Sequence, residues 1–120
     1  MRHGLIVDHS RVIRIVACRI LAALSFGSEA AADGASALMA CRRSIPDVVL
    51  LGRVLDMDEA EFLRALRLEA GADRPAVIVC PVEQDAARIA AALYAGASDC
   101  LVQPFDRSSI EAKFAEMGLV

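Results

Sequence analysis

Short aliphatic runs alternate along the chain with longer segments in which apolar residues recur every three or four positions. The runs at 5–7, 48–51 and 76–80 are apolar at every position, which is typical of strands covered on both faces of a parallel sheet. Residues 10–24 have apolar side chains at helical spacing, and Ser10 is a suitable N-cap for that helix. The pattern therefore predicts a strand followed by a helix at the start of the chain.

The same alternation continues to the C-terminus. It predicts a weak strand at 28–32, helices at 35–43, 56–70, 83–94 and 106–117, and a short strand at 100–102. Asp56 and Glu59 have the spacing of a capping box, which predicts that the third helix begins at Asp56. Five strands and five helices in strict alternation predict an α/β fold: a doubly wound parallel sheet with helices on both faces, in one domain over residues 1–120.

Composition narrows the class of protein. Hydrophobic residues make up 57% of the 120 residues and aromatic residues only 4%, so we expect an aliphatic core and exclude a disordered tail. The formal net charge of −3 disfavours nucleic-acid binding by bulk charge. No apolar run approaches the roughly 20 residues of a membrane span, and an acid follows the first apolar run too early for a signal peptide. We therefore expect a cytoplasmic protein.

The four cysteines are widely and irregularly spaced, at Cys18, Cys41, Cys80 and Cys100. A structural zinc site would need clustered ligands, which this spacing does not offer. Cys80 and Cys100 fall on neighbouring predicted strands and could form a redox pair. A reactive thiol needs an electropositive, partly exposed setting, and the aliphatic neighbours favour inert, buried or partly buried thiols instead.

Ligands of open parallel sheets bind outside the carboxyl ends of the strands. In this chain the residues at those ends are Asp8-His9, Gly52-Arg53, Pro81-Val82 and Gln103-Pro104. These positions hold most of the chemistry that the sequence offers.

The motifs at and between the strand ends resemble those of a known family. They are Leu5-Ile6-Val7-Asp8-His9-Ser10, Asp33-Gly34, 46–51, Glu61-Phe62-Leu63, 95–99 and Gln103-Pro104-Phe105-Asp106. In this order they are similar to response-regulator receiver domains of the single-domain, CheY-like kind. The tail at 111–120 is similar to a group of single-domain regulators associated with alphaproteobacteria. The resemblance implies a flavodoxin/CheY-like sheet with strand order 2-1-3-4-5, flanked by five helices.

The resemblance also implies a reaction, the transfer of a phosphoryl group from a histidine kinase to an aspartate, assisted by Mg²⁺. This sequence departs from the family at most of the residues involved. The nucleophile position falls on Gly52, the second metal-binding acid on His9 after the retained Asp8, the hydroxyl on Pro81, the lysine on Gln103, and the aromatic switch on Cys100. The loop after the third strand is one residue short, at 56–59. Glycine has no side chain to phosphorylate.

These departures predict a pseudo-receiver: a protein-interaction module of two-component, phosphorelay or chemotaxis-like signalling, without catalysis and without Mg²⁺ or another cofactor. The expected partner is a histidine kinase, a phosphotransferase or another signalling protein, with no role for nucleic acid or membrane, and the chain is expected to be a monomer or weak dimer. In the family the fourth helix, fifth strand and fifth helix recognise partners. The corresponding candidates, all expected to be exposed, are Arg88, Tyr94, Arg107 and Lys113.

Alternative interpretations remain open. Asp56 or Asp58 could be a displaced phosphoacceptor, although acids at a helix start are usually caps. The basic pairs Arg11/Arg14 and Arg42/Arg43 could bind a cyclic dinucleotide or another small anion, although arginines on a solvated helix face are the commoner case. Asp8 and His9 are too few ligands for a metal site, and a pairing of Asp8 with His9 or Arg53 is favoured. Arg53 could instead supply the positive charge that the family draws from metal and lysine.

Overall fold

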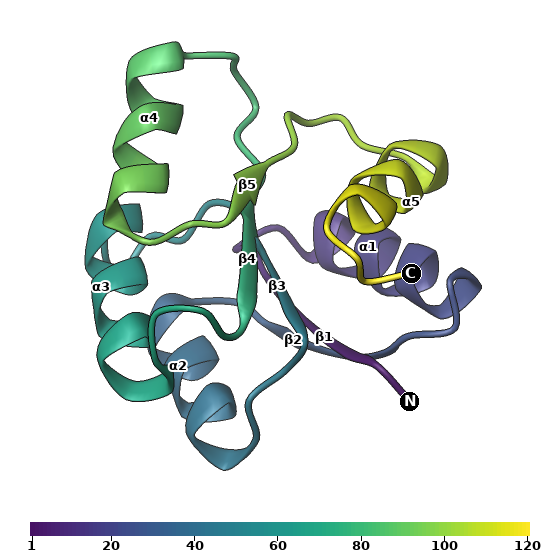
Figure 1. The fold of residues 1–120 in the computed structure, drawn as a ribbon, viewed down its shortest axis with the longest axis horizontal. Helices are drawn as coiled ribbons and strands as arrows, with labels where there is room; N and C mark the ends of the chain where they lie inside the picture. Colours follow the sequence, from purple (N-terminus) through teal and green to yellow (C-terminus); the bar gives the residue numbers. More distant parts are fainter.

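The computed structural model describes all 120 residues, which form a five-stranded parallel sheet in the order β2-β1-β3-β4-β5 with helices on both faces (Figure 1). The elements are β1 His3–Val7, α1 Arg11–Ala23, β2 Gly27–Ala31, α2 Gly34–Arg43, β3 Val48–Leu51, α3 Glu59–Ala70, β4 Ala76–Val79, α4 Ala86–Ala95, β5 Asp99–Cys100 and α5 Arg107–Glu116. This is the predicted architecture. None of the helices combines the length and the apolar character that crossing a membrane would require.

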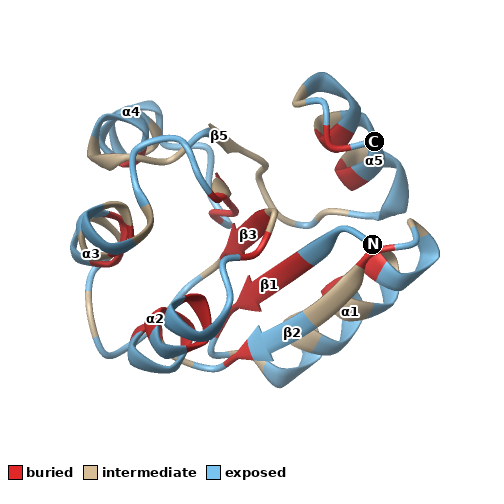
Figure 2. Ribbon diagram, turned by 60° about the horizontal axis from the view of Figure 1, so that its bottom comes forward, coloured by how far each residue is buried: buried red, intermediate tan, exposed pale blue.

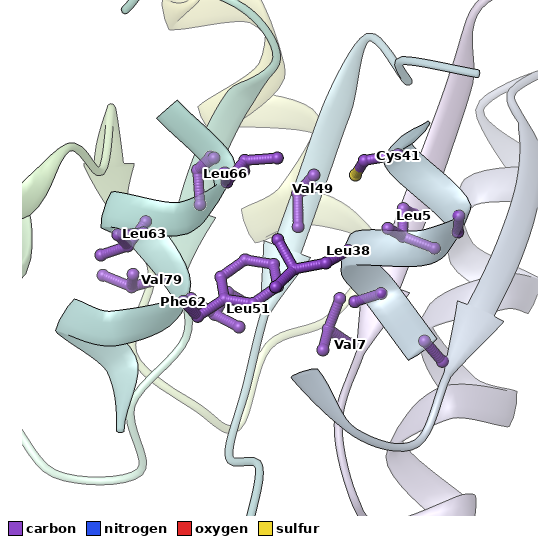
Figure 3. Packing of buried hydrophobic residues seen from close by; sticks show 14 of the residues in the cluster. Leu5, Val7, Leu38, Cys41, Val49, Leu51, Phe62, Leu63, Leu66 and Val79 are labelled. Carbon is purple, nitrogen blue, oxygen red and sulfur yellow. The ribbon is translucent and has the colours of Figure 1, made fainter. Parts of the chain in front are cut away.

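The core consists of two hydrophobic clusters, one on each face of the sheet, in which buried phenylalanines pack among aliphatic side chains. Alternate residues of the central strands point to opposite faces, so β1 and β3 are buried on both sides (Figure 2). Leu5, Val49 and Phe62 belong to the cluster beneath α2 and α3 (Figure 3). Ile6 and Phe114 belong to the cluster beneath α1 and α5. Burial on two faces explains why these strands are continuous apolar runs in the sequence.

Side-chain caps set the starts of the helices. Ser10 accepts a hydrogen bond from the Ile13 N–H at 3.4 Å, as expected of the α1 N-cap. The predicted start of α3 was wrong. The capping box pairs Asp58 with Glu61 instead of Asp56 with Glu59, and the helix begins at Glu59. Asp56 lies before the helix, where its carboxylate accepts the N–H groups of residues 34 and 35 at 2.9 and 3.0 Å, at the start of α2.

Other boundaries shift as well, most of them by one residue, and larger shifts occur at α4 and β5. The fourth helix begins at Ala86 rather than at residue 83, because Asp85 is its N-cap. The fifth strand is Asp99–Cys100 rather than 100–102, and its two residues pair with Ile78 and Val79 of β4. The α4 correction concerns polar residues at the start of the helix, whereas the β5 correction removes the apolar residues Leu101 and Val102 from the predicted strand.

The fourth helix is held to the fold by few side chains. Ala92 is its one buried residue, although the helix is rich in alanine. Arg67 of α3 secures its C-terminal end, donating hydrogen bonds from Nε and Nη2 to the Gly96 carbonyl at 2.9 and 2.8 Å and from Nη1 to the Pro75 carbonyl at 2.7 Å. Burial of this guanidinium lowers the pKa of Arg67. One side chain thus ties the end of α4 to α3 and to the start of β4.

Candidate functional site

The residues that follow the strands lie together, as the parallel topology predicts. A hollow of about 660 Å³ opens at the carboxyl edge of the sheet. Its lining residues are Asp8, His9, Ser10, Ile13, Gly52, Arg53, Glu59, Cys80, Pro81, Val82, Glu83, Arg88 and Gln103. The hollow therefore contains all five sequence-predicted site positions: residues 8, 9, 52, 81 and 103.

Asp8 is the only charged residue that the fold buries, with 3% of its surface exposed. One carboxylate oxygen, Oδ1, accepts a hydrogen bond from the Ser10 N–H at 2.8 Å. The other, Oδ2, is directed at Gly52: a Cβ atom at residue 52 would lie 2.8 Å from Asp8 Cγ and closer still to Oδ2. Such a contact is shorter than real Cβ atoms make, so the Asp8 carboxylate fills the space that a side chain on residue 52 would need.

His9 links the ends of β1 and β3. Its backbone N–H donates to the Arg53 carbonyl at 2.8 Å, and its Nδ1 lies 3.1 Å from the same oxygen. Nδ1 is also 3.5 Å from Asp8 Oδ1, so of the two expected partners of Asp8 the fold brings His9 close. The Arg53 side chain is exposed and forms no ion pair or hydrogen bond, so it does not pair with Asp8. It lies at the rim of the hollow instead.

The far side of the hollow is formed by the ends of β4 and β5. Pro81 is buried and presents neither a hydroxyl nor an N–H group. The Gln103 amide turns back to the sheet, where Nε2 donates to the Cys80 carbonyl at 2.8 Å. Cys80 itself is buried, and this burial raises the pKa of its thiol to about 12. Cys100, at the switch position, is half-buried on β5.

A second hollow, of about 360 Å³, adjoins the first between the β3–α3 connection and α4. Gly52, Arg53, Glu59 and Arg88 line both hollows. The pKa of the Glu59 carboxyl is raised, because the effect of burial outweighs the opposing effect of the nearby positive charge of Arg88. Glu59 and Glu83 were not recognised from sequence as site residues, because an acid near a helix start is equally typical of a cap.

The predicted partner-binding residues are not all exposed. Arg88, Tyr94 and Arg107 lie on the surface, and Tyr94 is 97% exposed. The prediction was wrong for Lys113, which is half-buried on α5. Its Nζ lies 3.2 Å from Asp99 Oδ1 and 3.2 Å from Glu116 Oε2, so its charge is paired within the fold.

The two basic pairs of arginines differ in whether the fold neutralises their charges. Arg42 forms a bidentate ion pair with Glu69, and Arg43 pairs with Glu29 at 3.0 Å. On α1, Arg14 donates to the Asp8 carbonyl at 2.8 Å, while Arg11 forms no ion pair. Asp56 and Asp58, the alternative phosphoacceptors, both accept backbone N–H groups at helix starts.

Comparison with known proteins agrees with this geometry. The family model described as the response regulator receiver domain matches residues 5–115. The chain is 27% identical over 110 residues to the DNA-binding response regulator MtrA of Mycobacterium tuberculosis, covering 91% of this chain and 47% of that protein. It therefore spans about half the length of the curated relatives it matches.

Solved structures share the fold over nearly the whole chain. The chemotaxis protein CheY4 of Vibrio cholerae superposes with a TM-score of 0.90 at 25% identity, covering 97% of this chain and 98% of that one. The receiver domain of the sensor histidine kinase PA1611 of Pseudomonas aeruginosa, described with a magnesium ion coordinated in its active-site cleft, superposes with a TM-score of 0.86 at 23% identity, covering 96% and 95%. With the strand order, the hollow at the strand ends and the family match in agreement, this chain belongs to the response regulator receiver domain family.

Proposed function

We propose that this receiver domain is a pseudo-receiver, a phosphorylation-independent interaction module of two-component signalling in the cytoplasm. The observation that carries the proposal is the relation between residues 8 and 52. Gly52 offers no nucleophile at the end of β3, and the Asp8 carboxylate takes up the space where one would stand. Phosphoryl transfer needs a carboxylate free to attack in line. A buried carboxylate that is hydrogen-bonded to Ser10 and directed at a backbone does not meet that need.

The side chains present do not fit the Mg²⁺ ion that the family reaction uses. Magnesium prefers carboxylate oxygens and waters in octahedral geometry. Here the second acid is replaced by His9, which contacts the Arg53 carbonyl, and the residue that follows β3 is Gly52, which has no side chain. Nowhere in the chain do three His, Cys, Asp or Glu side chains come close enough to hold an ion. We therefore propose a function that involves no metal and no catalysis.

The docking surface in this proposal is the one formed by α4, β5 and α5. Leu93 and Tyr94 expose apolar surface on α4, with 42% and 97% of each residue accessible. Arg88 on the same helix and Arg107 on α5 add unpaired positive charge. Aromatic residues and arginines are enriched at the centres of protein interfaces. Such a surface suits a histidine kinase or phosphotransferase that the domain would occupy and inhibit without accepting its phosphoryl group.

Intact-mass spectrometry tests the chemical half of the proposal. The chain is incubated with Mg²⁺ and acetyl phosphate, beside a receiver that has an aspartate at the position of Gly52. We expect the control to gain about 80 Da and this chain to gain nothing. A stoichiometric gain on this chain would overturn the proposal, and mapping of the modified peptide would show whether Asp8, Asp56 or Asp58 is the acceptor.

Kinase binding tests the other half. Purified histidine kinases and phosphotransferases from the same cell are titrated with the chain in the absence of any phosphodonor. Tyr94→Ala with Arg107→Ala should weaken the binding at least about tenfold, as loss of interface anchors does. Arg64→Ala on α3, also exposed and unpaired, is the matched control and should leave it unchanged. Equal weakening by both variants, or binding that requires a phosphodonor, would contradict the proposal.

A further inference from the structure

The exposed side of α1 next to β2 forms a shallow hollow of about 420 Å³ outside the strand-end site. Its lining residues are Arg11, Arg14, Ile15, Cys18, Arg19 and Ala30. The α1 residues among them recur at i, i+3, i+4, i+7 and i+8, so one face of the helix presents all three arginines. The neighbouring edge of the sheet supplies only the methyl group of Ala30.

No carboxylate balances these arginines. Helix α1 contains no acidic residue, and none lines the hollow. The nearest acid on β2 in sequence is Glu29, whose side chain lies on the opposite face of the sheet and pairs with Arg43 of α2. Within a chain of net charge −3, this patch concentrates three positive charges that the fold leaves unneutralised.

The three guanidinium groups differ in whether the fold orients them. Arg14 is half-buried and is oriented by the hydrogen bond from Nη1 to the Asp8 carbonyl at 2.8 Å, which leaves its other N–H groups free to bind a ligand. Arg11 and Arg19 are exposed and form no ion pair or side-chain hydrogen bond. Guanidinium groups bind phosphate oxygens through paired N–H donors. The hollow therefore has one oriented donor group flanked by two that can close on an anion.

We propose that this α1 hollow binds a small phosphate-bearing ligand of the polyphosphate or pyrophosphate-ester class. Several closely spaced negative charges are needed to engage three arginines, and a hollow of this size holds a diphosphate group with its waters. A long nucleic acid is disfavoured, because the acidic surface of the rest of the chain repels an extended polyanion. The strand-end hollow is a poorer anion site, because Asp8, Glu59 and Glu83 line it together with its arginines.

Calorimetric titration with inorganic pyrophosphate tests the inference, using two double variants that remove equal charge. Arg11→Ala with Arg19→Ala removes the unpaired arginines and spares Arg14, whose bond to Asp8 contributes to the fold. Arg42→Ala with Arg43→Ala removes two arginines that Glu69 and Glu29 already neutralise. We expect the α1 variant to weaken binding at least about tenfold and the α2 variant less than about twofold. Thermal melting confirms that both variants are folded.

Two further readouts locate the site. Raising the salt from low ionic strength should weaken pyrophosphate binding, and amide shifts on titration should centre on α1 and Ala30. Equal weakening in the two double variants would show attraction by net charge alone and would overturn the proposal. Shifts centred on Gly52 and Arg88, or the absence of binding at low salt, would overturn it as well.

Discussion

The Asp8 carboxylate lies where a side chain on Gly52 would begin, with its Cγ 2.8 Å from the position of a Cβ at residue 52. Residue 52 is therefore under steric constraint, and we expect Gly52→Ala to destabilise the domain by about 1–3 kcal/mol, as overpacking of a filled site does. Urea denaturation measures this loss. Asp8→Ala removes the obstructing group, so the double variant should be more stable than the sum of the two single losses predicts, by at least about 0.5 kcal/mol. Strict additivity would show that the two side chains do not compete for the space.

Arg67 fastens the end of α4 through the Gly96 and Pro75 carbonyls. Arg67→Ala leaves both carbonyls without their donor, and we expect a loss of about 2 kcal/mol in the free energy of unfolding. Amide hydrogen exchange should rise most along α4, which has Ala92 as its one other buried anchor. Arg64→Ala is the matched control on the same helix, because Arg64 is exposed and unbonded; it should change the free energy by less than about 0.5 kcal/mol. Similar losses in both variants would remove the special role of Arg67.

Asp56 connects the loop after β3 to the start of α2, and its hydrogen bonds from Gly34 and Ala35 lower the pKa of the carboxyl below its ordinary value of 3.8. Because the pKa of Asp56 is lower in the folded state than in the unfolded state, its carboxylate stabilises the fold at pH values above the ordinary pKa. This stability is lost as the pH falls through the folded-state pKa. Asp56→Asn should therefore be less stable than the wild type at pH 7, and the difference should shrink below about pH 4. Melting curves over this range measure it. Asp73→Asn, an exposed acid without a side-chain hydrogen bond, should show no such convergence.

The four thiols should react at two different rates. Burial raises the pKa of Cys80 to about 12 and that of Cys41 to about 11, and only a thiolate attacks a disulfide reagent. At pH 8 we expect Cys18 and Cys100, both half-buried, to react with Ellman's reagent well before the other two. Unfolding in urea should equalise all four rates. Early reaction of Cys80 in the folded protein would contradict its place in the core.

The interior of the fold could be predicted from sequence, and its edges only in part. β3 has the predicted bounds because Val48 to Leu51 are apolar at every position and the sheet buries them on both faces. The start of α3 could not be chosen, because Asp56/Glu59 and Asp58/Glu61 are overlapping motifs of equal spacing. The start of α2 decides between them, because its N–H groups at residues 34 and 35 donate to the Asp56 carboxylate and leave Asp58 to cap α3. The predicted exposure of Lys113 was wrong because its ion pair with Asp99 joins residues whose proximity the local pattern does not reveal.

By itself the sequence determined the alternation that builds a doubly wound sheet, the strand-end location of the site and the missing side chain at residue 52. These features follow from local periodicity and residue type, and they do not depend on which distant segments come into contact. Only the tertiary structure decided that Asp8 fills the space at Gly52, and that Arg42 and Arg43 are neutralised while the α1 arginines are not. The physical reason is that packing and charge pairing depend on which distant segments the sheet brings within a few ångströms of one another, and that distance is a property of the folded chain.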